Sequence, residues 1–419
     1  MSTSTDQVSA PAHKEHRFER PATRPPRLRE TLAALDATAL ANGLVAATFS
    51  MTGPVAVILA VGTRGGLSPA EISSWVFGVF FLNGLLTVLA SWLYRQPLAF
   101  FWTIPGTVVV GKSLGHLTWP EVLGAFFATG LLILALSLTG QVRRVMELLP
   151  GPVVMAMVAG VFLRFGLDLV DALVTDAVLV APMILAFALL MASAAAGRRV
   201  PPVLGALVVG VVVVLLVGRH DPDPGTRWLA DPVPASPAWS WAAMVELVVP
   251  LALTVLVVQN GQGMAVLTAA GHRPPMNLAT LACGVWSLGS AAVGAVSTCL
   301  TGPTNALLVA SGRRERQYAA GIVCGLLAVA FGLLAPGLVR TMLGMPVAFV
   351  AALGGLAMLR PLQGAFVAAF GGRLTLSALV TFLVAVADLT VWNIGGAFWG
   401  LVTGMLTARL LERDDLRDG

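Results

Sequence analysis

Apolar residues run along the chain in long stretches that recur from about residue 37 to residue 411, separated by short polar or Gly/Pro-rich joints. Many stretches are long enough to cross ~30 Å of hydrocarbon as a helix, at about 1.5 Å per residue. Residues 203–217 are apolar on every side, which excludes the alternating pattern of a membrane barrel. The pattern therefore predicts an all-α polytopic membrane protein, because helices satisfy their backbones within each segment.

The stretches divide into about fourteen segments in two groups of seven. The first group is expected at residues 37–62, 71–93, 97–114, 120–140, 147–166, 178–196 and 201–218, and the second at 244–269, 278–295, 297–311, 318–337, 342–359, 374–387 and 391–411. The predicted organisation is a disordered cytoplasmic tail (1–35), a first repeat (36–218), a periplasmic linker rich in Pro and Asp (219–240), a second repeat (241–411) and a cytoplasmic C-terminal tail (412–419).

Positive charge indicates how these segments are oriented. When the N-terminus is placed in the cytoplasm, most of the 26 Lys and Arg residues fall on the cytoplasmic side of the membrane. The C-terminus then lies on the same side. An odd number of segments in each group also means that the second group is inserted upside down relative to the first, so the sequence predicts a 7+7 inverted repeat.

Short internal matches support the repeat. Residues 103–105 (TIP) in the third segment match residues 301–303 (TGP) in the tenth. A second pair, Pro152-Val153 and Pro346-Val347, lies at nearly the same offset along the chain. Each match is weak alone, and their common offset is what indicates duplication.

Composition and charge narrow the function classes. The chain is 57% hydrophobic and only 11% charged, which is outside the range of soluble domains. Its basic residues are spread over many short loops, so no nucleic-acid partner is expected. The three cysteines lack metal-ligand spacing, and the segments contain no HExxH motif or Ser/His arrangement. We therefore expect no metal, no cofactor and no enzymatic activity.

The third and tenth segments are short and each is interrupted in its middle. Residues 98–104 favour a strand, after which Pro105-Gly106 suits the first turn of a half-helix. Residues 294–300 and 301–305 repeat this arrangement. Inverted orientation points the N-termini of both half-helices at one central place, where their partial positive charge suits a carboxylate. The alternative is that both interruptions are ordinary proline kinks.

Polar side chains also interrupt two other apolar segments. Residues 259–262 (QNGQ) lie in the middle of the eighth segment, where each unpaired amide would cost a few kcal/mol. Residues 49–54 (FSMTGP) interrupt the first segment. These groups either contact a ligand or make hydrogen bonds between helices, and for the first segment packing is the favoured alternative.

Five motifs carry a family resemblance that runs from about residue 32 to residue 411: 77–84 (FGVFFLNG), 96–107 (QPLAFFWTIPGT), 155–166 (MAMVAGVFLRFG), 259–263 (QNGQG) and 297–305 (STCLTGPTN). The sequence resembles the BenE-type benzoate:proton symporters. This resemblance implies a fold like that of the uracil transporter, with a core domain of segments one to four and eight to eleven and a gate domain of the others, which move as an elevator.

The resemblance also implies the cargo and the site. The expected partners are an aromatic carboxylate, a proton and the lipid bilayer of the bacterial inner membrane, and a homodimer is one expected assembly. Substrate is expected between segments three and ten with help from one and eight. The expected substrate-binding residues are Ser50, Phe101, Trp102, Thr103, Gly106, Thr107, Gln259, Asn260, Gln262, Thr301, Gly302, Thr304 and Asn305.

Acidic residues set this chain apart from the nucleobase transporters of similar fold. Those relatives carry carboxylates at positions that here correspond to Gln259 and Pro303, so nucleobase recognition is not expected. The nearest carboxylates, Glu246 and Asp388, lie at the outer ends of their segments. They are the candidates for proton coupling. The alternatives are that both are solvated interfacial carboxylates, and that the proton travels with the substrate as the neutral acid.

The function expected from these observations is import of benzoate or a related aromatic carboxylate by proton symport. Helix dipoles and amides recognise a carboxylate without specifying its ring, so transport of another organic anion is a second hypothesis. A third is an anion channel or sensor, which could use the same half-helix site without alternating access.

Overall fold

The computed structural model describes residues 19–21, 23–142, 150–193, 200–218, 228–387, 389, 391 and 396–417. Within these ranges, seven helical stretches are long and apolar enough to cross a membrane: Ala37–Arg64, Pro69–Tyr94, Trp119–Thr139, Gly151–Thr175, Trp241–Ala269, Arg314–Leu333 and Val347–Phe370. Shorter apolar helices accompany them. The expectation of an all-α polytopic membrane protein is confirmed, and the number of crossing segments stays a prediction.

The first half begins with α1 (Leu28–Ala34) and continues through α2 (Ala37–Met51), α3 (Gly53–Arg64), α4 (Pro69–Phe77), the π-helical turn η1 (Gly78–Leu82), α5 (Asn83–Tyr94), β1 (Phe100–Trp102), α6 (Ile104–Ser113), α7 (Trp119–Thr139), α9 (Gly151–Thr175), α10 (Ala177–Ala192) and α12 (Pro202–Val217). The first segment is broken at Thr52, directly before Gly53-Pro54, because proline has no N–H to continue the helix.

The second half contains α13 (Trp241–Ala243), η2 (Met244–Val248), α14 (Val249–Leu253), η3 (Thr254–Asn260), α15 (Gly261–Ala269), α16 (Met276–Ala291), β2 (Thr298–Leu300), α17 (Gly302–Leu308), η4 (Arg314–Arg316), α18 (Gln317–Leu333), α19 (Ala335–Leu343), α20 (Val347–Phe370), α21 (Thr375–Val386), α22 (Gly396–Leu411) and α23 (Arg413–Arg417). The third and tenth segments are therefore each a short strand followed by a half-helix, as the sequence predicts.

Helix contacts occur in matched pairs between the two halves. Helix α7 packs on α16, and the equivalent elements α18 and α5 pack on each other. In the same way, the contact of α9 with α21 in one direction matches the contact of α20 with α10 in the other. The contact of α10 with α12 in the first half matches that of α21 with α22 in the second. Each contact is thus the counterpart of one made by the equivalent segments of the other half. This is the arrangement expected of an inverted repeat.

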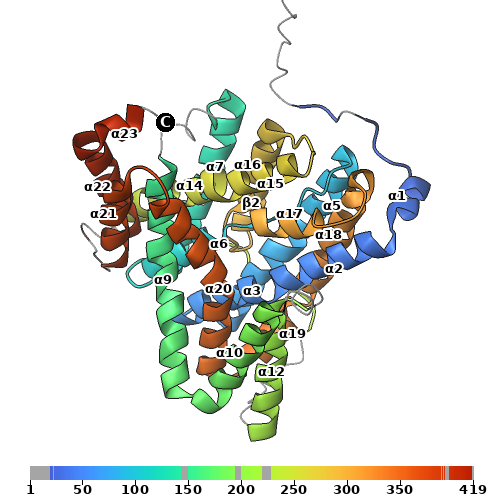
Figure 1. The fold of residues 1–419 in the computed structure, drawn as a ribbon, viewed down its shortest axis with the longest axis horizontal. Helices are drawn as coiled ribbons and strands as arrows, with labels where there is room; N and C mark the ends of the chain where they lie inside the picture. The colour runs from blue at the N-terminus through green and yellow to red at the C-terminus, as the bar shows by residue number, and fades with distance from the viewer. Residues whose placement is uncertain are drawn as a thin grey trace, which may run out of the picture.

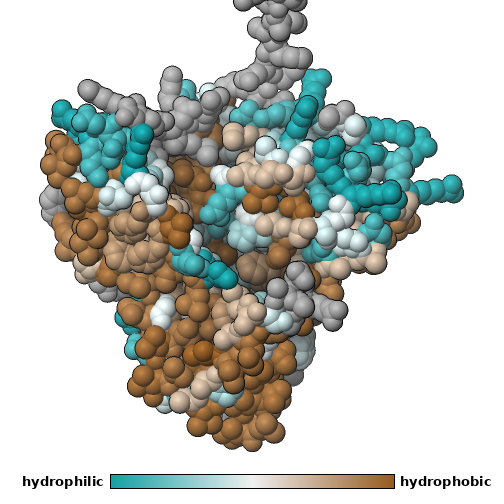
Figure 2. Space-filling view, in the orientation of Figure 1, coloured by the Kyte–Doolittle hydropathy of each residue, from teal (hydrophilic) through white to brown (hydrophobic). Residues whose placement is uncertain are grey.

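The helices form two groups. We call α9, α10, α12, α20, α21 and α22 the gate helices, and the elements from α2 to α7 together with those from α13 to α18 the core helices. In Figure 1, α9 and α20 run between α21 and α22 on the left and α10 and α12 at the bottom, while α2, α5 and α18 lie on the right. Figure 2 shows apolar residues over the lower part of this view and hydrophilic residues along its upper and right edges.

Two expected boundaries differ from the structure. Part of the tail expected to be disordered forms α1, and the chain before it is held by hydrogen bonds from Tyr94 Oη to Glu19 O (2.7 Å) and from Trp92 Nε1 to Pro26 O (3.0 Å). The end of the linker lies along other loops, where Ala235 N donates to Ala292 O at 2.9 Å. Helix α20 continues to Phe370, past the end expected at residue 359, so Arg360 lies within the helix.

Polar contacts join core to gate at the ends of the helices predicted to face outward. Arg64 at the end of α3 places its Nη2 2.6 Å from Asp168 Oδ2 on α9. The other oxygen of Asp168 lies 3.1 Å from Arg164 Nε, one turn earlier on the same helix, as i,i+4 spacing allows. Lys112 Nζ on α6 donates to Ala385 O on α21 at 2.6 Å. These contacts hold core and gate together on that side.

Substitution of Asp168 by Asn should weaken this contact. The Asp168 side chain is only 7% exposed, so its loss leaves two arginines without their buried partner. We expect a loss of about 1 to 2 kcal/mol, because both guanidinium groups remain partly solvated. In a thermal scan of detergent-purified protein this is a melting temperature lower by about 1 to 2 °C. Asp171→Asn, an exposed position on the same helix, is the matched control. Equal melting temperatures for the two variants would contradict the prediction.

Candidate binding site at the half-helix ends

Strands β1 and β2 cross in the interior as an antiparallel pair, with Phe100 opposite Leu300 and Trp102 opposite Thr298. Backbone bonds extend the pairing at both ends, from Thr103 N to Ser297 O (3.1 Å) and from Thr301 N to Ala99 O (3.1 Å). The chain then turns directly into α6 and α17. Because the strands are antiparallel, the two half-helices begin at opposite ends of this pair and run away from it.

Side chains from neighbouring helices satisfy the outer edges of the strand pair. Thr87 Oγ1 on α5 both accepts from Phe100 N (2.8 Å) and donates to Phe100 O (2.9 Å). On the other edge, Asn260 Oδ1 accepts from Leu300 N at 2.7 Å, and Ser287 Oγ accepts from Thr298 N at 3.0 Å. These side chains therefore give backbone groups on the outer edges of both strands hydrogen-bond partners within the protein.

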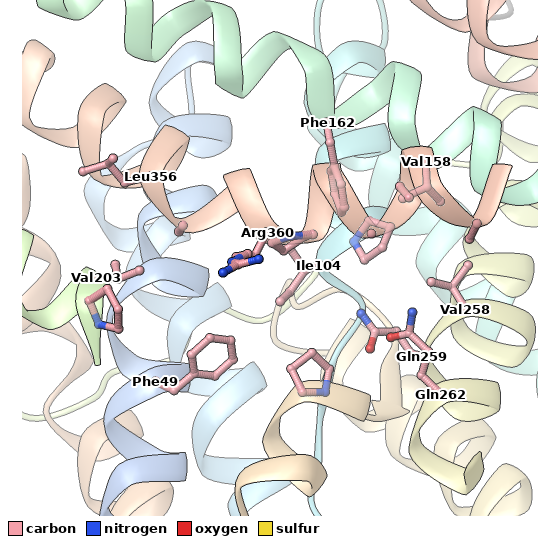
Figure 3. Close-up of a pocket in the computed structure, with 18 of the residues that line it drawn as sticks. Phe49, Ile104, Val158, Phe162, Val203, Val258, Gln259, Gln262, Leu356 and Arg360 are labelled. Atoms are coloured by element: carbon pink, nitrogen blue, oxygen red, sulfur yellow. The ribbon is translucent and has the colours of Figure 1, made fainter. Parts of the chain in front are cut away.

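A pocket of about 460 Å³ lies where the half-helices begin. The core contributes Phe49 of α2, Ile104 and Pro105 of α6, Pro303 of α17, and Val258, Gln259 and Gln262 of the eighth segment. The gate contributes Met155, Val158, Phe162, Phe187, Met191, Pro201, Pro202, Val203, Leu356, Ala357, Arg360, Pro361, Gly364, Ala365 and Ala368. Figure 3 shows the labelled side chains around this space. Most of the wall is apolar, which suits a ring.

Two amides of the eighth segment face the pocket. Gln259 is 4% exposed, and among the described residues its Oε1 has no hydrogen-bond partner. Gln262 also lines the pocket and is exposed to it. An unpaired buried amide costs free energy that a ligand can recover. These are the predicted site residues whose side chains line the pocket.

Other predicted site residues hold the architecture around the pocket. Asn305 is fully buried, and its amide bonds both the N–H (2.9 Å) and the carbonyl (3.1 Å) of Ala99 beside β1. Ser50 Oγ and Thr304 Oγ1 lie 3.1 Å apart and join α2 to α17. None of these three side chains lines the pocket. Their contacts fix where the half-helices begin.

The residues of β1 and the caps are likewise buried. The rings of Phe101 and Trp102 pack edge-on against Phe80, with centroids 5.8 and 5.1 Å apart. Thr103 caps α6 by accepting from Gly106 N at 3.1 Å, and its hydroxyl bonds Thr254 Oγ1 at 2.8 Å. The remaining predicted residues, Thr107 and Thr301, are also buried beside the strand pair.

Two of the predicted site residues are glycines, and the packing around them also explains why no larger residue fits there. A Cβ atom on Gly106 would lie 2.4 Å from Thr103 Cγ2 and 2.9 Å from Leu251 Cδ2. On Gly302 it would lie 2.6 Å from Gln262 Cβ. Both positions are thus closed to larger residues by neighbouring side chains. Gly302 in particular lets α17 approach the chain segment that carries Gln262.

Sequence reasoning did not nominate the gate side of the pocket. Phe162 and Val158 of α9 and Leu356 of α20 were assigned to apolar spans, and Arg360 was assigned to a loop. Apolar wall residues have no distinguishing pattern in a sequence that is apolar throughout. Arg360 did carry a signal, because it and Pro361 are an unusual pair within an apolar helix.

Glu246 lies away from the pocket, in η2, and is 2% exposed. Its carboxylate lies 2.8 Å from His116 Nε2 and accepts a short hydrogen bond from Ser113 Oγ at the end of α6. The alternative in which Glu246 is a solvated interfacial carboxylate does not fit the structure, because Ser113 and His116 cover it. Asp388, the second proton-coupling candidate, lies outside the described residues.

Solved structures share this architecture. The transmembrane domain of the cyanobacterial bicarbonate transporter BicA superposes with a TM-score of 0.62 at 15% identity, covering 92% of this chain and 99% of that one. A structure of the murine anion transporter Slc26a9 in its inward-facing state gives a TM-score of 0.65 at 13% identity, covering 94% and 73% of the two chains. These similarities show that the fold is that of a membrane transport domain.

Sequence comparison gives the family. The family model for the benzoate membrane transport protein, BenE, matches residues 33–410, and the chain belongs to this family. Inner membrane protein YdcO of Escherichia coli is 29% identical over 369 residues, which are 87% of this chain and 93% of that protein. The benzoate membrane transport protein of Acinetobacter baylyi is 27% identical over 376 residues, which are 88% and 94% of the two chains. The resemblance read from the motifs is confirmed.

Adjacent amides should respond differently to substitution by Leu. Gln259→Leu should raise the KM for a ligand that the pocket binds, with benzoate as the first compound to test, and should change the melting temperature little, because the Gln259 amide oxygen has no protein partner to lose among the described residues. Asn260→Leu should lower the melting temperature instead, because it leaves Leu300 N unpaired in the interior, at a cost of about 1 to 3 kcal/mol. Uptake kinetics and thermal scans on both variants test this. An unstable Gln259→Leu with normal KM would indicate packing.

Proposed function

We propose that this protein imports benzoate or a related aromatic carboxylate together with a proton. The observation that carries the proposal is the pocket itself: a largely apolar cavity lined by the Gln259 amide, whose oxygen has no partner among the described residues, and by the first turn of α6. An apolar wall accommodates an aromatic ring, and a helix N-terminus with an amide N–H donor suits a carboxylate. Membership of the benzoate membrane transport family agrees with this chemistry.

The conformation supports a pocket that opens to the cytoplasm. Its gate residues lie in the first half of α9, in α20 from Leu356 to Ala368, at the end of α10 and at the start of α12, which are the parts predicted to face inward. At the opposite ends of these helices the Arg64–Asp168 pair and the Lys112–Ala385 contact join core to gate. We therefore propose an inward-facing state and movement of the core against the gate as an elevator.

The distribution of positive charge supports a placement of the protein in the cell. Both termini lie on the cytoplasmic side of a bacterial inner membrane, where the Escherichia coli relative is an inner membrane protein. Import of an anion against an inside-negative potential costs about 2.3 kcal/mol per charge per 100 mV, so accumulation requires a cation. A proton fits this requirement.

Glu246 is the proposed proton carrier. It is a buried carboxylate, and its contact with a histidine gives a proton a path to it through a side chain that is partly exposed. His116 is 21% exposed and connects Glu246 to the outside. Ser113 connects it to α6, whose other end lines the pocket. Helix α6 therefore links proton binding to the substrate site.

Transport is tested directly in proteoliposomes. We expect labelled benzoate to accumulate when an inward proton gradient is imposed, and to equilibrate without accumulation when the gradient is collapsed. Channel behaviour would appear as flux down the gradient of benzoate with no accumulation under either condition. A panel of organic anions and uracil in the same assay defines the substrate. Uptake of uracil but not of benzoate would overturn the proposal.

The Glu246→Gln variant distinguishes a proton carried by Glu246 from a proton carried on the substrate carboxyl group. If Glu246 carries the proton, the variant should keep benzoate counterflow but lose accumulation driven by the proton gradient. Glu121→Gln is the matched control, because Glu121 is a partly exposed carboxylate that caps the neighbouring helix α7 and glutamine can keep that cap. Full gradient-driven accumulation by Glu246→Gln would eliminate this residue as carrier and leave co-transport with the substrate carboxyl group.

A further inference from the structure

Arg360 lines the pocket but has no part in the function argued above. It lies in the middle of α20, next to Pro361, which also lines the pocket. Figure 3 shows its guanidinium reaching into the space between the half-helix start at Ile104 and the ring of Phe49, with Gln259 and Gln262 further along the same space. The pocket therefore has a cation on its gate side, facing the amides of its core side.

This cation lacks an acidic partner in the part of the chain that the structure describes. Its Nη1 donates to Gln363 Oε1 at 2.9 Å, three residues later on the same helix. No described carboxylate lies within ion-pair distance of it. Arginine has five N–H donors and no acceptor, so most of its donors remain available to a ligand.

A positive charge beside an apolar wall within the membrane is costly unless an anion accompanies it. The planar guanidinium matches a carboxylate in two parallel hydrogen bonds, which a lysine or an amide cannot reproduce. The second polar group in the pocket, Gln259, is also without a partner for its oxygen among the described residues. The free donors of Arg360 suit a carboxylate, whereas the free oxygen of Gln259 suits a hydrogen-bond donor, and only the Nε2–H of Gln259 can bond a carboxylate.

We propose that Arg360 binds the carboxylate of the substrate directly and is a determinant of specificity for an anionic aromatic ligand. This assignment rests on the function proposed above. The ring then packs against Phe49 and Phe162, which lie on the core and gate walls. The carboxylate accepts from the guanidinium of Arg360 on α20 and, on the core side, from the Nε2–H of Gln259, which is the donor of that amide. Neutral isosteres such as benzamide lose the charged contact and bind more weakly.

The position of Arg360 also makes the contact depend on conformation. Gln259 and Ile104 belong to the core, whereas Arg360 belongs to the gate. When the core moves relative to the gate, the core residues keep their places around the substrate and Arg360 does not. Arg360 thus strengthens carboxylate binding in the conformation described here and releases it when the core moves away.

Binding measurements on purified variants test the assignment. By titration calorimetry, Arg360→Gln should raise the Kd for benzoate about tenfold, as expected for loss of a charge-assisted contact, and Arg360→Lys should raise it less because it keeps the charge. Arg373→Gln, a nearby basic residue beyond the end of α20, is the control and should leave the Kd unchanged. Melting temperatures without ligand should be equal, because Arg360 is exposed to the pocket and makes no ion pair among the described residues.

A second measurement needs no variant. An arginine-directed dicarbonyl reagent is applied to the wild-type protein, and peptide mass spectrometry reports modification at Arg360 and Arg373. Benzoate should protect Arg360 and leave Arg373 unprotected, while benzamide at the same concentration should protect neither.

The outcomes separate this assignment from the proposed function. If wild-type protein binds benzoate, but Arg360→Gln binds it equally well and benzoate gives no protection, the role of Arg360 is overturned and the proposed function stands. If wild-type protein binds no aromatic carboxylate, the proposed function is overturned and the role of Arg360 with it.

Discussion

The structure depends on one constraint: two short strands cross in an apolar interior, and every backbone N–H and carbonyl on them needs a partner. Strands β1 and β2 satisfy one edge of each other. Their outer edges are satisfied by Thr87 on one side and by Asn260 and Ser287 on the other. Because a strand covers more length per residue than a helix, this arrangement brings two helix N-termini to the interior of the protein.

Polar residues around the strands therefore have two different roles. Asn260 and Asn305 hold strand backbones, and the Ser50–Thr304 contact joins two core helices. Gln259, adjacent to Asn260, lines the pocket instead. The π-helical turn η3, which ends at Asn260, precedes α15 and shapes how this segment presents successive side chains. A substitution in this cluster acts on stability or on binding according to the side that the residue faces.

The charged side chains described above differ in the partners that surround them. Asp168 is paired with two arginines where core meets gate, and Glu246 is paired with His116 within the core. Arg360 has only an amide partner among the described residues, and it faces the pocket. A charge buried with its counter-ion stabilises one arrangement of helices, whereas a charge without one is available to a ligand. This difference separates the contacts that hold the conformation from those that can recognise substrate.

The sequence by itself determined the membrane class, the inverted repeat and the strand-plus-half-helix segments, because each leaves a local mark: long apolar runs, matched Thr-x-Pro motifs and a proline after a β-prone stretch. It also indicated that Gln259 and Gln262 need partners. Only the tertiary structure decided which nominated residues face the pocket, that Glu246 is buried, and that Arg360 enters the site from the gate. Those facts depend on how helices distant in sequence pack together, which no local pattern records.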